Sequence, residues 1–64
     1  MIKVFNVGDR VKLSDELLSY SQNKHWIGKR GTVEKFDGSY ALVKWDHLDK
    51  PHYQPQEFIE VARG

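Results

Sequence analysis

The sequence predicts one small all-β domain, and two kinds of pattern support this prediction. The first is a β-hairpin between Gly28 and Asp46, in which two arms rich in β-branched and aromatic residues flank the turn dipeptide Asp37-Gly38. The second is the alternation of apolar and polar residues over residues 10–13 and 59–62, which is typical of half-buried strands. A chain of 64 residues buries only roughly 60% of its surface, so we expect a single domain without a deep, enclosed site.

The two arms of the hairpin are expected to divide their side chains between a core face and an outer face. On the first arm, Val33 points inward, whereas Phe36 falls out of step with it and indicates a β-bulge near Lys35. The second arm alternates in the same way. Its inward residues are Ala41, Val43 and Trp45, and its outward residues are Tyr40, Leu42 and Lys44.

A helical turn is expected early in the long connection between the first strand and the hairpin. Ser14 is a good N-cap, because its hydroxyl can accept a hydrogen bond from a free backbone N–H. The acidic Asp15 and Glu16 suit the positive end of a helix. The rest of the connection, as far as Gly28, is predicted to be ordered by burial of Leu17, Leu18 or Trp26.

Short elements complete the chain at both ends. His52 is expected to begin a short strand, and Pro55 to open a helical turn over residues 54–58 before the final strand. An apolar lead-in forms either an extra edge strand or a flap over the core, and its residues are Ile2, Val4 and Phe5.

The predicted core consists of the inward residues of the strands. They are Val11, Leu13, Val33, Ala41, Val43, Trp45, Phe58, Ile59 and Val61. Burial of each large apolar side chain contributes roughly 1.5–3 kcal/mol. The sequence has no cysteine, so the fold must rest on this packing and not on disulfides or a thiolate-bound metal.

The order of strand, long loop, hairpin, short strand, helical turn and final strand resembles the SH3-like small β-barrel. The resemblance covers residues 1–64 nearly entirely and is carried by residues 7–11, 28–34, 43–46 and 53–61. It implies a five-stranded SH3-like barrel whose long first loop carries a short helical turn. It also implies a 3-10 turn before the last strand.

Two narrower likenesses bear on function. The Gly-x-x-Gly-x-Val run over residues 28–33 is similar to the KOW motif of ribosomal and transcription-factor barrels, which implies nucleic-acid contact. The fuller pattern, with Trp45-Asp46 followed by Pro51 and Tyr53, is similar to small barrel proteins of phages and bacteria. The basic tail common in KOW proteins is missing.

Enzyme chemistry and metal binding find little support in the sequence. There is no cysteine nucleophile, and the serines lie in caps and turns, so no catalytic residue is expected. His25, His47 and His52 have no recognised metal-ligand spacing. Gly28 and Gly31 match no phosphate-binding motif and are expected to make turns or close contacts. We therefore expect a non-catalytic binding module without a metal or cofactor.

A basic and aromatic cluster around the long connection is the candidate nucleic-acid site. Ten Lys and Arg against nine Asp and Glu give a formal charge of only +1, so a basic surface must arise by local segregation. Lysine and arginine would meet phosphates, and an exposed tyrosine or tryptophan would stack on unpaired bases. Trp26 has a second interpretation, as a plug of the core. The residues of this site are Lys24, Lys29, Arg30, Lys35, Tyr20 and Trp26.

A protein partner is the alternative. Leu42 on the outer face of the hairpin, with tyrosines beside it, would form an apolar patch of the kind found at interface centres, unless the lead-in covers it. Open strand edges also allow pairing with a second chain, which fits a monomer or a weak homodimer. The residues of this interface are Tyr40, Leu42, Lys44 and Tyr53.

The sequence also bears on where the protein acts. No apolar run approaches the roughly 18 residues that a membrane-spanning helix needs, so we expect no membrane partner. The first residues lack the long apolar segment and cleavage site of a secretory signal. We therefore expect a cytoplasmic protein.

Overall fold

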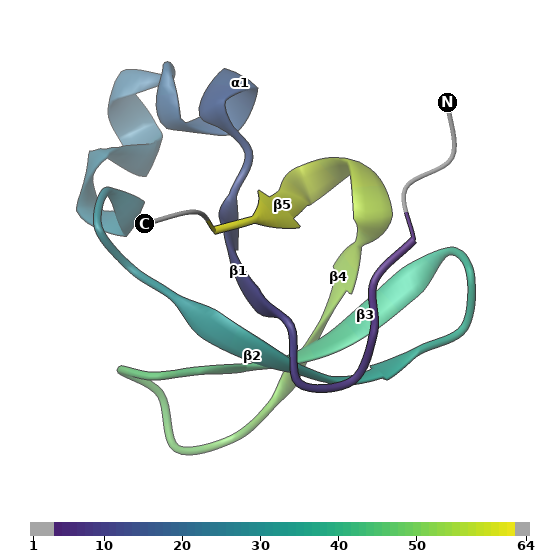
Figure 1. Ribbon diagram of the computed structural model, residues 1–64. Helices are drawn as coiled ribbons and strands as arrows, with labels where there is room; N and C mark the ends of the chain where they lie inside the picture. Colours follow the sequence, from purple (N-terminus) through teal and green to yellow (C-terminus); the bar gives the residue numbers. More distant parts are fainter. Residues whose placement is uncertain (1–3, 63–64) are drawn as a thin grey trace.

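The computed structural model describes residues 4–62 and shows five β-strands and three short helices (Figure 1). In chain order these are β1 (Arg10–Leu13), α1 (Asp15–Leu18), η1 (Ser21–Trp26), β2 (Gly31–Phe36), β3 (Tyr40–Trp45), β4 (His52–Pro55), η2 (Gln56–Phe58) and β5 (Ile59–Val61). The helices η1 and η2 are of the 3-10 type. The predicted all-β class and the 3-10 turn before the last strand are confirmed. None of the helices in the described residues is long and apolar enough to cross a membrane.

The five strands form one antiparallel sheet in the order β4-β3-β2-β1-β5. Its edges are β4 and β5, and no ladder joins these two strands within residues 4–62, so the sheet does not close into the predicted barrel. The sheet still bends around one core. Ile59 of β5 belongs to the same buried cluster as Ala41 and Val43 of β3, although three strand-to-strand steps separate β5 from β3.

The hairpin of β2 and β3 contains the bulge that the sequence predicts. The register of the two strands shifts between Val33 and Lys35, so that Glu34 is an extra residue in β2. Lys35 consequently lies opposite Leu42, on the outer side of the sheet. Phe36 returns to the inner side and packs against the core. The bulge thus explains why Val33 and Phe36 both face inward at an odd spacing.

Asp37 holds the turn of the hairpin. Its Oδ1 atom accepts hydrogen bonds from the backbone N–H groups of Tyr40 at 2.8 Å and Ser39 at 2.9 Å. These bonds, the one from Tyr40 foremost, lower the pKa of the Asp37 carboxyl below its ordinary value. Gly38 has a φ of +98°, a conformation that glycine adopts without steric cost. The predicted turn at Asp37-Gly38 is confirmed.

Gly31 is needed where three strands approach closely. It lies opposite Val11 of β1 and Trp45 of β3. A Cβ atom added at Gly31 would lie 2.6 Å from Cγ1 of Val43 and 3.0 Å from Cε3 of Trp45. Gly28 has a φ of +83° in the turn that precedes β2. The two glycines therefore serve close packing and a turn, as the sequence analysis expects.

The core contains most of the residues predicted for it. Those confirmed as buried are Val11, Leu13, Val33, Ala41, Val43, Trp45 and Ile59. Two predictions are wrong, because Phe58 is 44% exposed and Val61 is 43% exposed. Phe58 ends η2 at the surface. Val61 lies opposite the buried Val11, yet it is the last residue of a three-residue edge strand and little of the chain covers it.

The core also takes one residue from the N-terminal lead-in. Phe5 is buried and meets Phe36 edge to face, with ring centroids 5.5 Å apart. Residues 4–6 form no strand, so the lead-in is not an extra edge strand in the described residues. Val4 remains exposed, and Ile2 lies outside the described residues. Phe5 therefore fills the core from the side, which periodicity alone does not reveal.

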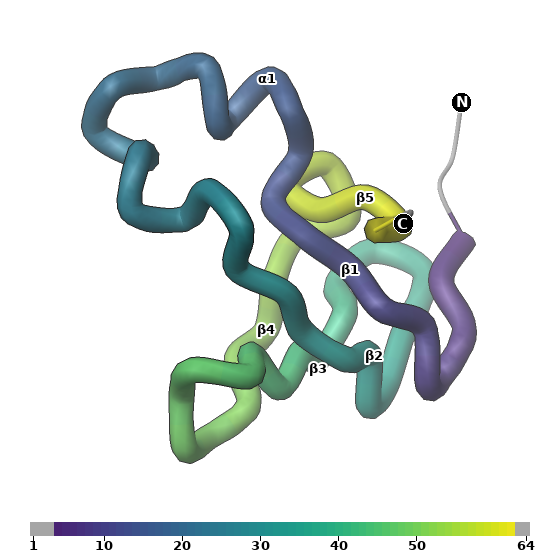
Figure 2. The backbone as a smooth tube through the Cα atoms, turned by 60° about the vertical axis from the view of Figure 1, so that its left-hand side comes forward, coloured from purple at the N-terminus to yellow at the C-terminus, as the bar shows by residue number. Residues whose placement is uncertain are grey.

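The connection between β1 and β2 is a compact excursion and not an irregular loop. Ser14 caps α1 by accepting a hydrogen bond from the N–H of Leu17, which confirms the predicted cap. Asn23 of η1 donates its side-chain amide to the carbonyl of Leu17 at 2.9 Å. Leu17, Leu18 and Trp26 all pack partly buried against the core. Figures 1 and 2 show this excursion projecting from the sheet, on the side away from the β2–β3 turn.

Candidate binding surface and neighbouring hollows

The outer side of β2, β3 and β4 carries two exposed tyrosines. We call this side the outer face. Directly opposed residues of antiparallel strands project to the same side, and Tyr53 of β4 lies opposite Leu42 of β3. Tyr40 stands two positions from Leu42 on the same side and is 50% exposed, and Tyr53 is 62% exposed. Three residues of the predicted protein interface are thus brought together.

A lysine completes this row of side chains. Lys35 of β2 lies opposite Leu42 on its other flank, so that Tyr53, Leu42 and Lys35 cross three neighbouring strands in one line. Strands in a sheet lie roughly 4.8 Å apart, which places the backbone of Tyr53 about 10 Å from that of Lys35. Lys35 is exposed and forms no ion pair within residues 4–62. The outer face therefore joins Lys35, predicted for nucleic acid, to residues predicted for a protein partner.

Lys44 shares the outer face but is partly committed to the fold. It lies opposite Thr32 of β2. Its Nζ donates a hydrogen bond to the carbonyl of Trp45 at 3.1 Å and another to the carbonyl of Leu48. Lys44 therefore anchors the loop after β3 while adding positive charge to the outer face.

Arg10 of β1 and Asp46 form an ion pair at the margin of the outer face, so together they add no net charge to it. The guanidinium of Arg10 donates two hydrogen bonds to the carboxylate of Asp46 and a third, at 2.7 Å, to Oγ1 of Thr32. The bonds from Arg10 hold the pKa of the Asp46 carboxyl below its usual range and raise the pKa of Arg10. Arg10 is not among the residues that the sequence predicts for a site. Its alternation with Val11 predicts an outward side chain, but no local sequence pattern reveals that it pairs with a residue 36 positions away.

The predicted nucleic-acid site around the long connection is not brought together as one surface. Tyr20 and Lys24 are exposed at η1, whereas Lys29 and Arg30 are half-buried before β2. Arg30 donates a hydrogen bond to the carbonyl of Lys29 at 3.0 Å. Lys35 lies at the far end of β2, roughly 16 Å from Arg30 along five extended residues. The bulge and the length of β2 separate Lys35 from the other members of the site.

Trp26 is held against the core. Its ring meets Trp45 edge to face, with centroids 5.0 Å apart, and meets His47 in the same way at 5.2 Å. His25 lies 5.6 Å away in a tilted arrangement. Trp26 is half-buried as a result. Trp26 therefore packs as the predicted plug of the core. Of the two aromatic residues predicted for the nucleic-acid site, Tyr20 is the exposed one.

A small hollow opens beside Trp26 on the inner side of the sheet. Its volume is about 180 Å³, and its walls are Trp26, Trp45, Leu48, His52 and Gln54. His52 and Gln54 lie opposite the buried Val43 and Ala41, so they project to the inner side of β4. Tyr53, between them in the sequence, projects to the outer face. One edge strand therefore separates this hollow from the outer face.

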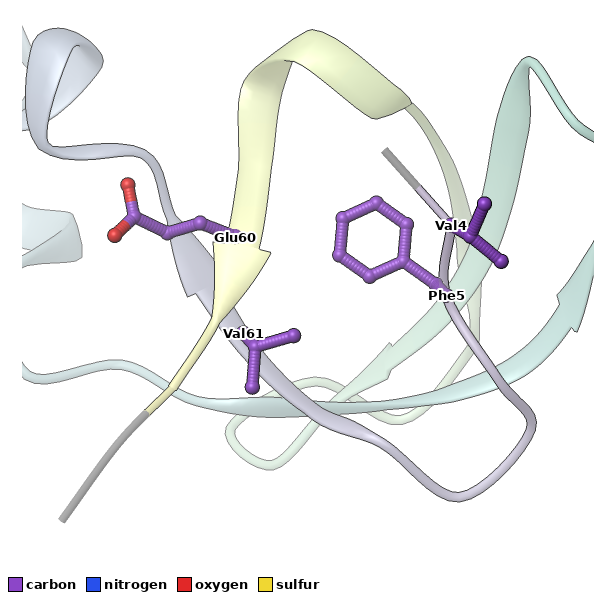
Figure 3. A pocket seen from close by; sticks show the side chains of 4 residues that line it. All are labelled: Val4, Phe5, Glu60 and Val61. Carbon is purple, nitrogen blue, oxygen red and sulfur yellow. The ribbon is translucent and has the colours of Figure 1, made fainter. Parts of the chain in front are cut away.

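A second hollow of about 270 Å³ lies between the lead-in and β5 (Figure 3). Val4, Phe5 and Val61 give it apolar walls. Glu60 also borders it, but its carboxylate extends away from the space in Figure 3 and accepts a hydrogen bond from the backbone N–H of Asp15 at 2.9 Å. The hollow therefore offers little polar chemistry for recognising a ligand, although it is the larger of the two.

The structure and the comparisons with known proteins identify neither a metal site in residues 4–62 nor a related protein. Within residues 4–62, no three His, Cys, Asp or Glu side chains gather closely enough to hold a metal ion. Comparison of the chain with protein-family models, with curated proteins and with solved structures gave no match. The outer face and the hollow beside Trp26 are therefore the two candidate sites.

Proposed function

We propose that this protein is a cytoplasmic, non-catalytic binding module that holds single-stranded nucleic acid on its outer face. The observation that carries the proposal is the row of Tyr53, Leu42 and Lys35 across three strands, with Tyr40 beside it. Exposed tyrosines on a sheet provide flat rings on which unpaired bases stack. A lysine within the same row is placed to meet the phosphate that follows a stacked base.

The charges of the outer face support this proposal over a purely apolar interface. Arg10 and Asp46 neutralise each other, and the exposed Glu34 of the bulge is the acidic neighbour of the row. The charges at the paired outer positions of β2 and β3 come from Lys35 and Lys44. Both are positive, although the whole chain is nearly neutral at +1. Local segregation of this kind is sufficient to attract a polyanion weakly and in a salt-dependent manner.

We also propose that the sheet is an open form of the SH3-like small barrel and that the KOW-like run serves its fold. The order of the strands, the long connection and the 3-10 turn along the chain follows the pattern on which the resemblance rests, and this supports the proposal. Within the run, Gly28 supplies a turn with positive φ, and Gly31 permits the close approach of Val43. The likeness to KOW barrels therefore supports the architecture, while the side chains that meet the ligand lie elsewhere on the sheet.

Titration of labelled single-stranded DNA and RNA at two salt concentrations tests the proposed function. We expect binding at low salt that weakens as salt rises. Lys35→Ala should reduce the salt dependence by roughly 0.7 in the slope of log K against log salt, the value for one lost phosphate contact on a single strand. Tyr53→Ala should weaken binding by roughly 1–3 kcal/mol through the loss of stacking, and Tyr53→Phe should restore most of it.

Lys24→Ala is the matched control, because it removes the same charge from an exposed position on η1. We expect it to change binding less than Lys35→Ala does. An effect of Lys24→Ala equal to or greater than that of Lys35→Ala would show that nucleic acid binds at the long connection and not on the outer face. Absence of binding at low salt, or binding indifferent to salt, would overturn the proposed function itself.

A protein partner remains the second candidate, because Leu42 places an apolar side chain at the centre of the same row. This candidate predicts a self-associated species in sedimentation velocity that is insensitive to moderate salt. Leu42→Glu would abolish that association by burying a charge at the interface. A monomer at all concentrations, together with salt-dependent nucleic-acid binding, would decide against self-association.

A further inference from the structure

The hollow beside Trp26 has the size of a site for a single ring system. Its volume of about 180 Å³ is below the roughly 300–1,000 Å³ of pockets for drug-sized ligands. Trp26 and Trp45 both border it, and their indoles meet edge to face. Trp26 is half-buried, so part of its ring remains open to a ligand. These properties favour a small planar group.

Trp45 lies fully buried behind this hollow. Its side chain exposes no surface, yet its Nε1 atom has no acceptor among the described residues. A buried N–H without an acceptor costs free energy, and nearly all such groups in folded proteins find a partner. Trp45 borders the hollow but exposes no surface, so its indole supports the ring of Trp26 from the core and does not itself contact a ligand.

Polar side chains at the rim add selectivity. His52 and Gln54 both project from β4 to the inner side and border the hollow. A carboxamide offers a donor and an acceptor side by side, and a neutral imidazole offers one of each. This is the pattern with which proteins bind the edge of a nucleobase.

We propose that the hollow receives one unpaired nucleobase of a strand that lies on the outer face. The inference rests on the proposed function and adds a base-selective site to it. Tyr53 stacks a base on the outer face, and its neighbours His52 and Gln54 on the same strand hold the next base on the inner side. The nucleic-acid strand thus passes around β4, which is an edge of the sheet and has no further strand beside it within residues 4–62. Trp26 packs against the inserted base, and His52 and Gln54 form hydrogen bonds to its polar edge.

Free nucleosides test the hollow without any phosphate contact. Adenosine, guanosine, cytidine and uridine are titrated separately into ¹⁵N-labelled protein, and the two tryptophan indole N–H signals are followed by NMR. The chain has two tryptophans, so the Trp26→Phe variant assigns the remaining signal to Trp45. We expect at least one nucleoside to move the signals of the Trp26 indole and the Gln54 carboxamide. The absence of any shift with all four nucleosides would overturn the inference.

Homopolymeric oligonucleotides then separate the hollow from the outer face. Gln54→Ala and His52→Ala should reduce the preference for the favoured base by roughly tenfold, the worth of a good base contact, while binding of the least favoured homopolymer persists. Tyr53→Ala and Lys35→Ala should weaken all homopolymers alike. Glu57→Ala, at an exposed position on η2, is the control and should change neither quantity.

The two proposals fail in different ways. Nucleoside-induced shifts at Trp26 and Gln54 without oligonucleotide binding would overturn the proposed function and support the hollow as a base site. Oligonucleotide binding in which Gln54→Ala weakens every homopolymer equally would support the function and overturn base selection in the hollow. Shifts of the same signals by a short proline-rich peptide, with none by nucleosides, would assign the hollow to a protein ligand and overturn the inference.

Discussion

Strand β3 presents two faces with opposite properties. Ala41, Val43 and Trp45 expose no surface, whereas the alternate positions of the same six residues carry Tyr40, half exposed, and the cation of Lys44. Because successive side chains of a strand point to opposite sides, one short segment both closes the core and presents the outer face. Stability and binding can therefore be changed separately, by substitutions one residue apart.

The largest effect is expected from Trp45→Ala. Removal of this fully buried indole should destabilise the fold by about 3–5 kcal/mol, which approaches the whole stability of a small domain. Chemical denaturation followed by circular dichroism measures the change. Tyr53→Ala is the matched control on the outer face and should stay within about 0.5 kcal/mol. A cooperative Trp45→Ala variant of nearly normal stability would break the distinction between the faces.

An intermediate effect is expected from Gly31→Ala. The added Cβ would lie 2.6 Å from Cγ1 of Val43, and overpacking of a core typically costs about 1–3 kcal/mol. The double variant with Val43→Ala removes the clashing atom. It should be less destabilised than the sum of the two single variants, as measured in a double-mutant cycle. Strict additivity would show that the close approach of β2 and β3 is not what requires glycine.

The smallest effect is expected from Asp46→Asn, which removes the ion pair at the margin of the outer face and should change how stability depends on acid pH. The pKa of Asp46 is lowered in the folded state by Arg10, so the ion pair contributes stability above the unfolded pKa of about 3.9. That contribution is lost as the pH falls through the lower, folded pKa. In Asp46→Asn, the melting temperature should fall less steeply between about pH 4 and pH 2.

Asp37 also has a lowered pKa and remains in the Asp46→Asn variant, so part of the acid dependence should persist. High salt should weaken the Asp46 contribution, since both partners are solvated and screening is effective. An unchanged acid dependence in Asp46→Asn would show that the Arg10 pair adds nothing to stability.

The sequence predicts the inner face better than the outer one. Alternation identifies Val11, Val43 and Trp45 as core residues because each strand must bury one row of side chains. Phe5 escapes this reasoning, since it enters the core from a segment without strand periodicity. Val61 fails for the opposite reason, because correct periodicity at the end of an edge strand does not guarantee that anything covers it.

The residues of the candidate site can be predicted from the sequence, but their arrangement on one surface cannot. All residues of the outer row are among those predicted for a site, yet Lys35 belongs to the predicted nucleic-acid site and Tyr53 to the predicted protein interface. Which strand pairs with which, and where the bulge places Lys35, are properties of long-range pairing that no local pattern contains. The hollow beside Trp26 depends on contacts between η1, β3 and β4 for the same reason.

The edges of the sheet have a consequence for the behaviour of the protein at high concentration. The edge strands β4 and β5 have only four and three residues, and β4 ends in Pro55, which has no backbone N–H to donate. A chain that added itself to either edge would gain few hydrogen bonds before it met the end of the strand. Short, interrupted edges of this kind protect β-proteins from fibrous aggregation, even though this sheet leaves both edges open.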